Sequence, residues 1–136
     1  LKNDNISVIY EDKYGDIWIG TYMAGLICYN KQSDKIIRFR FDARNKNSIS
    51  SDKILSICED KNGRLWIGTG NGLEAFDRNT YSFYHYLNKD GLVYEVINAM
   101  IIDEKNNLWL ATNNGITKFI MSFVRVYSFK VCKCNS

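Results

Sequence analysis

The side chains that could support catalysis are few, and their spacing does not supply the partners they need. His85 is the only histidine among the 136 residues. A Ser-His-Asp triad needs an imidazole bonded to both a serine and an acid, and the sequence places neither beside His85. Adjacent carboxylates recur as Glu11-Asp12, Glu59-Asp60 and Asp103-Glu104. Each pair closes an apolar run and is typical of a solvated turn, whereas glycoside hydrolysis needs two carboxylates facing each other across a cleft. We therefore expect no catalytic residue and no enzyme activity.

The four cysteines are the remaining residues with metal or redox chemistry. Cys28 and Cys58 lie inside apolar patterns, and we interpret them as small buried hydrophobic residues. Cys132 and Cys134 lie near the end of the sequence, but no second pair of Cys or His ligands completes a four-ligand site. We expect no metal and no cofactor.

Charge and hydropathy argue against two further classes. Eighteen Lys and Arg face 15 Asp and Glu, a net charge of +3, and a nucleic-acid binder usually has a stronger basic stripe. No apolar run approaches the roughly 20 residues of a membrane helix. The opening residues Leu1 to Asn5 have no signal-peptide character. We expect no nucleic-acid partner, and neither a membrane segment nor a signal peptide in this sequence.

Three tryptophans mark an internal repeat, which must position the residues above. Trp18, Trp66 and Trp109 follow one another at intervals of 48 and 43 residues, close to the roughly 40–50 residues of a β-propeller blade. Their surroundings align without gaps over Asp12–Thr21, Asp60–Thr69 and Asp103–Thr112. The fixed place of the tryptophans predicts core positions rather than exposed sugar platforms. A small residue follows two positions later as Gly20, Gly68 or Ala111, which predicts close approach of a neighbour.

Each copy also has an aspartate three residues before a position that suits a left-handed backbone. The aspartates are Asp12, Asp60 and Asp103, and the turn residues are Gly15, Gly63 and Asn106. The carboxylate can accept hydrogen bonds from neighbouring amides, and glycine adopts a positive φ readily. Asparagine is the next best residue for that conformation, so Asn106 supports a shared turn in the third copy.

Four short apolar segments per copy, joined by tight turns, predict an all-β fold of three four-stranded antiparallel meanders. First strands are expected at Ile6–Glu11, Ile54–Glu59 and Ile97–Ile102, third strands at Leu26–Asn30, Leu73–Asp77 and Ile116–Ile120, and fourth strands at Ile36–Phe41, Phe83–Leu87 and Val126–Phe129. Such meanders are β-propeller blades, and three of them form an incomplete ring. We expect one propeller segment over residues 1–136, with blades at about 6–41, 53–87 and 96–129 and a divergent tail at 130–136.

These motifs resemble the two-component-regulator propeller repeat from the periplasmic sensor region of hybrid two-component histidine kinases, especially those of gut Bacteroidetes. The most specific stretches are Glu59–Thr69 and the following Asn71-Gly72-Leu73. The segments between blades, Asn47–Ile54 and Asp90-Gly91-Leu92, are similar to this family as well. The resemblance implies a periplasmic, non-catalytic ligand sensor, and many members respond to oligosaccharides.

The sequence also departs from that family. The family usually has a ring of about seven blades followed by a sandwich domain, a membrane helix and a kinase, whereas three blades are recognised here. The turn before the last expected strand reads Ile120-Met121-Ser122-Phe123 in place of the polar residues of the other copies. The tail from Val131 to Ser136 does not resemble the family.

Ligands of propellers usually bind at one mouth of the ring, and we expect sugar contacts there. The candidate ligand-binding residues are Tyr22, Arg44, Asn71, Tyr94 and Asn113. Aromatic rings can stack on sugar faces while amides and guanidinium groups bond hydroxyls. The alternative is that these residues belong to solvated turns. Two other functions stay open: a protein-interaction scaffold that uses exposed blade faces, and a propeller lyase or hydrolase.

Three blades leave two apolar blade faces without a neighbour, and large apolar patches rarely stay exposed. We therefore expect association. Two chains could form a homodimer that closes a six-bladed ring around a two-fold axis. The alternative is that the segment docks on further propeller blades.

Overall fold

The computed structural model describes residues 4–86, 96–121 and 125–129, which form three antiparallel four-stranded sheets. The first blade contains β1 (Ile6–Glu11), β2 (Ile17–Thr21), β3 (Leu26–Asn30) and β4 (Lys35–Phe39). The second contains β5 (Ile54–Glu59), β6 (Leu65–Thr69), β7 (Gly72–Asp77) and β8 (Ser82–Tyr86). The third contains β9 (Ile97–Ile102), β10 (Leu108–Thr112), β11 (Gly115–Ile120) and β12 (Arg125–Phe129). In each sheet every strand pairs with its neighbour in sequence, so the predicted all-β propeller-blade fold is confirmed. The described residues include no helix long and apolar enough to cross a membrane.

The predicted strands are correct apart from their ends. The first strand of each blade has the predicted bounds. The strand β4 ends at Phe39 rather than at the predicted Phe41, because the Phe41 amide leaves the ladder and donates to Asp52 Oδ1 at 2.8 Å. The predicted end of the last strand of the second blade, Leu87, lies outside the described residues.

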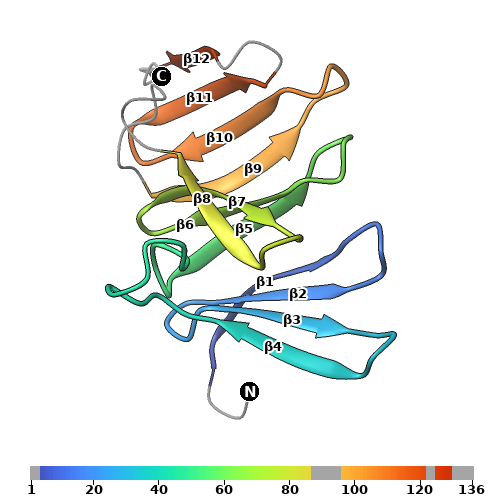
Figure 1. The fold of residues 1–136 in the computed structure, drawn as a ribbon. Helices are drawn as coiled ribbons and strands as arrows, with labels where there is room; N and C mark the ends of the chain where they lie inside the picture. Colours follow the sequence, from blue (N-terminus) through green and yellow to red (C-terminus); the bar gives the residue numbers. More distant parts are fainter. Residues whose placement is uncertain (1–3, 87–95, 122–124, 130–136) are drawn as a thin grey trace.

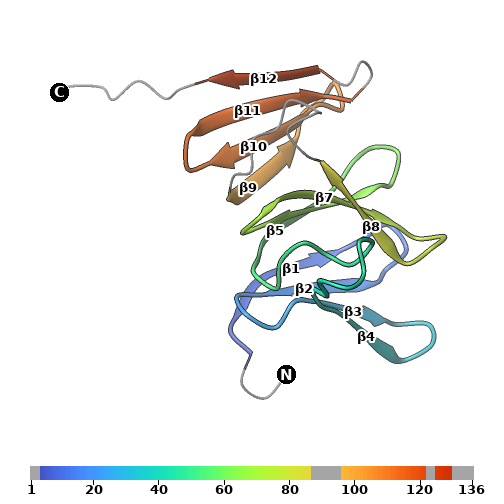
Figure 2. The same cartoon turned by 60° about the vertical axis from the view of Figure 1, so that its left-hand side comes forward.

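The three sheets are stacked one upon another, with their first strands β1, β5 and β9 in contact along the stack (Figure 1). The turns β1–β2, β5–β6 and β9–β10 lie on one edge of the stack. The turns β2–β3, β6–β7 and β10–β11 lie on the opposite edge, together with the loop that joins the first two blades. Figure 2 gives the same arrangement from another side.

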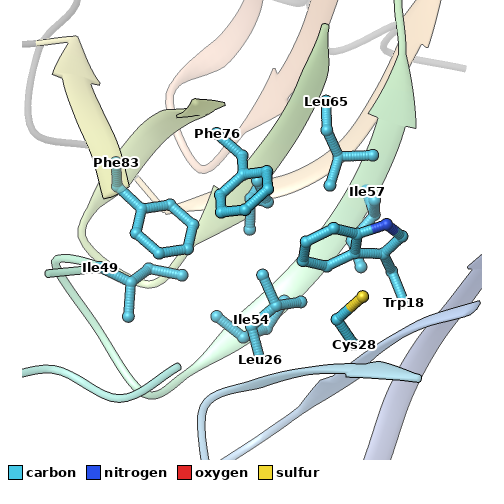
Figure 3. Close-up of a cluster of buried hydrophobic side chains, with 10 residues drawn as sticks. Trp18, Leu26, Cys28, Ile49, Ile54, Ile57, Leu65, Phe76 and Phe83 are labelled. Carbon is cyan, nitrogen blue, oxygen red and sulfur yellow. The ribbon is translucent and has the colours of Figure 1, made fainter. Parts of the chain in front are cut away.

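Alternation along the strands gives every blade two apolar faces, and the first core fills the space between the first and second blades. Trp18, Leu26 and Cys28 enter it from the first blade. Phe76 and Phe83 enter from the second blade and lie opposite them (Figure 3). Burying a side chain of this size contributes roughly 1.5–3 kcal/mol, so this core is a main source of the stability of the pair.

A second core joins the second and third blades in the same way. Trp66 and Leu73 of the second blade meet Leu108, Leu110 and Phe119 of the third blade. The second blade therefore has both faces covered, and all five residues of β6 are buried. Among the described residues, the first and third blades each have one face covered by another blade.

Glycines in the second strands allow the blades to approach closely, as predicted. A Cβ added at Gly20 would lie 2.6 Å from Ile54 Cγ2 of the next blade, and one at Gly68 would lie 2.7 Å from Ile97 Cγ2. Both distances are far inside van der Waals contact, so alanine does not fit without displacing the next blade. Ala111 holds the same position in β10, on the face of the third blade that no described blade covers.

Candidate functional site

The recurring Asp turn is built around one carboxylate. In the first blade Asp12 Oδ1 accepts from the amides of Tyr14 at 2.9 Å and Asp16 at 3.0 Å. Its other oxygen, Oδ2, accepts from the Trp18 indole Nε1 at 2.7 Å. Gly15 has a φ of 82°, as the turn requires. The aspartate thus fixes both the turn and the tryptophan that starts the core.

The same geometry recurs in the other blades. Asp60 accepts from Trp66 Nε1 at 2.9 Å, and Asp103 accepts from Trp109 Nε1 at 2.8 Å. Gly63 has a φ of 79° and Asn106 a φ of 62°. The sequence predicted the amide bonds and the left-handed residue, but it did not predict the bond to the indole, because that contact depends on how the next strand folds back.

The carboxylates of Asp12 and Asp103 bind protons weakly. Burial raises the pKa of Asp12, but hydrogen bonds from Arg78, Trp18 and the Asp16 amide outweigh it, so the pKa of that carboxyl lies below its usual range. The hydrogen bond from the Trp109 indole and those from Asn107 and Lys105 lower the pKa of Asp103. These carboxylates are ionised structural acceptors, which agrees with their interpretation as turn residues rather than acid catalysts.

Arg78 connects two blades at the edge that carries the Asp turns. It follows β7 and reaches Asp12 Oδ2 of the preceding blade at 2.6 Å through Nη2. The same nitrogen lies 3.6 Å from Glu59 Oε2 of its own blade. Its guanidinium also lies 4.5 Å from the centre of the Tyr14 ring. One arginine therefore bridges a carboxylate on each side of the blade junction.

Two of the predicted core tryptophans are fully buried, Trp18 at 1% and Trp66 at 0% exposure. Trp109 is only partly buried, because its face of the third blade has no described neighbour. The thiols of Cys28 and Cys58 are buried and free, and burial raises the pKa of each to about 12. Such thiols behave as hydrophobic side chains. Cys132 and Cys134 lie outside the described residues.

The predicted ligand-binding residues that the structure describes lie in separate turns and loops. Tyr22, Asn71 and Asn113 lie in equivalent turns of successive blades, on the edge that also carries the loop between the blades. Asn113 Oδ1 accepts from Asn98 at 2.9 Å, and Asn71 bonds the backbone of Ser50 at 3.5 Å. Tyr94 lies outside the described residues.

Arg44 lines a groove of about 680 Å³ between β4 and β8 that the loop between the first two blades borders. Its aromatic wall includes the exposed rings of Phe41 and Tyr81. The polar wall consists of Arg38, Arg40, Arg44, Asp42, Asn45, Asn47, Ser48, Thr80 and Ser82. The arginines of this groove lie close together in the sequence. Tyr81 belongs to the next blade, and its spacing in the sequence did not identify it as a groove residue.

The arginines of the groove are held in place by carboxylates. Arg38 pairs with Asp4 at 3.0 Å, Arg40 with Asp52 at 3.2 Å and Arg44 with Asp42 at 3.3 Å. A guanidinium has five donors, so one ion pair leaves N–H groups for another acceptor. The groove therefore combines flat apolar rings with oriented hydrogen-bond donors.

A second polar cluster joins the loop between the blades to the second blade. Glu74, which is 1% exposed, accepts from Ser50 Oγ through Oε1 and contacts His85 Nδ1 through Oε2. His85 Nε2 donates to the Lys46 carbonyl at 2.9 Å, so in the neutral ring Nδ1 has no hydrogen. Burial raises the pKa of Glu74 despite the opposing bonds from Ser50 and His85. A protonated Glu74 can therefore donate to His85 Nδ1 through this contact.

This cluster is not a nucleophile with its base. The serine bonds the carboxylate rather than the imidazole, and the remaining ring nitrogen is committed to a carbonyl. A general base must reach the proton that it removes. Glu74 was missed by sequence reasoning, although a lone acid inside the apolar run Leu73–Phe76 was a signal that could have marked it.

Stacked four-stranded meanders with a tryptophan-centred core define the chain as a β-propeller segment. The two component regulator propeller family matches residues 1–23, 48–71 and 91–114, more than half of the sequence. The chain belongs to this family, a family of non-catalytic sensor propellers of two-component systems. No curated protein matches it.

Solved structures agree with this fold. The extracellular domain of a B. thetaiotaomicron protein assigned to the hybrid two component systems aligns with a TM-score of 0.80 and 22% identity, over 91% of this chain and 18% of that one. Another B. thetaiotaomicron extracellular domain, assigned to the one component systems, gives 0.77 and 26%, over 96% and 19%. A catalytically inactive virginiamycin B lyase from Staphylococcus aureus gives 0.75 and 16%, over 98% and 44%, which shows likeness of fold alone. The chain spans less than a fifth of the extracellular domains that it matches.

Proposed function

We propose that the chain is the ligand-sensing part of a periplasmic sensor propeller in a hybrid two-component system, and that it binds an oligosaccharide without chemical change. Its family and the extracellular domains with the same fold support the sensor role. The observation that carries the choice of ligand is the groove between β4 and β8, where exposed aromatic rings lie beside arginine donors.

The groove suits a sugar better than it suits an apolar ligand. Phe41 and Tyr81 offer flat surfaces on which the C–H face of a pyranose ring can stack. The guanidinium groups and the amides of Asn45 and Asn47 can bond ring hydroxyls, and sites of this kind fix a ligand through a few placed polar groups. Each of the three arginines is already paired with a carboxylate, so their remaining N–H groups can bond sugar hydroxyls without requiring an acidic sugar.

Titration calorimetry and thermal unfolding with neutral and uronate-containing oligosaccharides test the proposal. A ligand of the native state should raise the melting temperature with its concentration, by about 2.7 kcal/mol of stability at one hundred times Kd. The variants Phe41→Ala and Arg44→Ala should each weaken binding about tenfold, equivalent to about 1.4 kcal/mol.

The matched control is Tyr84→Ala, which removes an exposed ring outside this groove and should leave affinity unchanged. Tyr22→Ala tests the mouth of the blades as an alternative site. Loss of binding in Tyr22→Ala with normal binding in Arg44→Ala would place the ligand at the mouth and contradict the groove. Turnover of a bound sugar would contradict the non-catalytic role.

A further inference from the structure

Two blade faces are not covered by another blade of the described residues. The first-blade face carries Ile6, Ile9, Tyr29 and Ile36 on β1, β3 and β4. The third-blade face carries Ile101, Trp109, Ile116, Tyr127 and Phe129 on β9 to β12. Ile9 is 65% exposed, Ile36 63%, Ile101 64% and Phe129 51%. The two faces differ, because one corresponds to the leading side of a blade and the other to its trailing side.

The covered junctions inside the chain show what each face is built to meet. Trp18 stacks on Phe39 with ring centres 5.9 Å apart, and Phe76 of the next blade packs edge-on against Trp18 at 4.9 Å. In the second blade Phe119 caps Trp66 at 5.9 Å. At each junction, a tryptophan and a neighbouring aromatic ring of one blade meet a capping ring from the third strand of the next blade.

The third-blade face presents such a pair without a cap. Trp109 stacks on Phe129 at 6.4 Å with an interplanar angle of 19°, nearly the geometry of Trp18 and Phe39. No other ring of the described residues packs on this pair. Tyr29 occupies in β3 the position that Phe76 has in β7, because Ile17 pairs with Tyr29 as Leu65 pairs with Phe76. The first-blade face thus holds the ring that the third-blade face lacks.

The charged residues at the edge with the Asp turns also make the first-blade face complementary to the third-blade face. Arg78 bridges Glu59 of its own blade and Asp12 of the preceding one. Lys31 is the equivalent residue of the first blade and pairs with Glu11 of its own blade at 2.8 Å. By analogy with Arg78, Lys31 would also pair with the turn aspartate of a preceding blade. In the third blade the equivalent of Asp12 is Asp103.

We propose that a second copy of this chain docks head to tail, with the first-blade face of each copy on the third-blade face of the other. The ring of Tyr29 then caps Trp109 and Phe129 of the partner, and Lys31 reaches Asp103. Reciprocal docking closes a six-bladed ring around a two-fold axis, within the range of four to eight blades known for propellers. This proposal does not depend on the ligand of the groove.

Ala111 sets the fit of this junction. Ile6 lies at the position of Ile54 and Ile97, the residues that press on Gly20 and Gly68. The methyl group of Ala111 therefore keeps Ile6 of the second copy farther away than the next blade lies from either glycine. The new junction is looser than the two internal ones, and removing that methyl group should tighten it.

Light scattering coupled to size-exclusion chromatography, over about 1–100 μM, tests the proposal. The native chain should have about twice the mass of 15.8 kDa. Ile36→Lys and Ile101→Lys each place a charge at a residue that is exposed in the single chain, so the fold is kept and both should be monomers. A mixture of the two should form a heterodimer, because one junction in it is intact. Ala111→Gly should dissociate at a concentration several-fold lower than the native chain.

The controls separate this arrangement from others. Met23→Lys adds the same charge at a residue that is 82% exposed in a turn outside both faces, and it should remain a dimer. Lys31→Glu should weaken the dimer about tenfold more than Lys35→Glu. A monomeric native chain at 100 μM would overturn the proposal. It would also be overturned by two variants that fail to restore each other, or by assemblies larger than two copies.

Discussion

At the scale of single residues, one carboxylate per blade joins a turn to the core. Asp60 accepts two amides and one indole N–H, so it satisfies three donors with two oxygens. Its side chain is buried together with Trp66. A buried donor that loses its acceptor costs about 1–3 kcal/mol. The stability of each blade therefore depends on a residue that contributes no apolar surface.

Asp60→Asn should lower the free energy of unfolding by about 1–3 kcal/mol, because the amide nitrogen that replaces Oδ2 faces the indole N–H of Trp66 with a second donor. Urea unfolding followed by tryptophan fluorescence measures the change. Asp103→Asn is the matched control and should cost less, since Trp109 is only partly buried and water can replace the lost bond. Equal losses at the two sites would contradict this account.

Residue types and spacing were enough to predict these turns but not the contacts between blades. The glycine or asparagine of each turn is a local requirement of the backbone, and the positive φ values of Gly15, Gly63 and Asn106 agree with it. Arg78 and Tyr81 act on residues more than thirty positions away. Such contacts depend on how two sheets are placed against each other, which no short pattern encodes.

At the scale of elements, hydrogen bonds to Glu74 and His85 hold the loop between the first two blades to the second sheet. Glu74 in β7, His85 in β8 and Ser50 in the loop form a continuous chain of hydrogen bonds. The equivalent residues of Glu74 in the other blades are Ile27 and Thr117, both uncharged. The second blade alone therefore couples its neighbouring loop to a titrating group.

The stability of the chain should fall as pH rises above the ordinary pKa of glutamate, 4.5, through the raised pKa of Glu74. The sign follows because the folded state keeps a proton that the unfolded state releases, so the contribution is fully present below pH 4.5 and is lost on ionisation. The slope is at most about 1.4 kcal/mol per pH unit for one proton. Thermal unfolding between pH 4.5 and pH 8 measures it.

Glu74→Gln supplies the comparison for this pH dependence. A glutamine can donate to His85 Nδ1 and accept from Ser50, as the protonated acid does, without ionising. The variant should lose most of the slope and be at least as stable as the native chain near pH 8. An unchanged slope in Glu74→Gln would assign the pH dependence to other groups.

At the scale of the whole molecule, the covered second blade differs from its two half-covered neighbours. Two cores hold three sheets together, and the outer faces present exposed apolar side chains, among them Ile9, Ile36, Ile101 and Phe129. The alternating pattern of the strands predicted these faces, because every copy is apolar on both sides. The pattern could not predict which aromatic ring of one face caps which tryptophan of the other face.

The melting temperature of the native chain should rise with protein concentration, because a partner that binds only the folded state stabilises it by mass action. Differential scanning calorimetry at about 5 and 100 μM measures the shift, which should be several degrees. Ile36→Lys should melt at the same temperature at both concentrations. A native chain that melts independently of concentration would show that its open faces stay free.

The two sides of a blade are unlike each other, and this gives the stack a direction. Tryptophan always faces forward and the capping ring always faces back, so every seam has the same sense along the chain. A stack of such blades can gain or lose one complete blade and still have one tryptophan face and one capping-ring face at its ends. Removal of half a blade would instead leave a junction without its tryptophan, which lies on the second strand, or without its capping ring, which lies on the third strand.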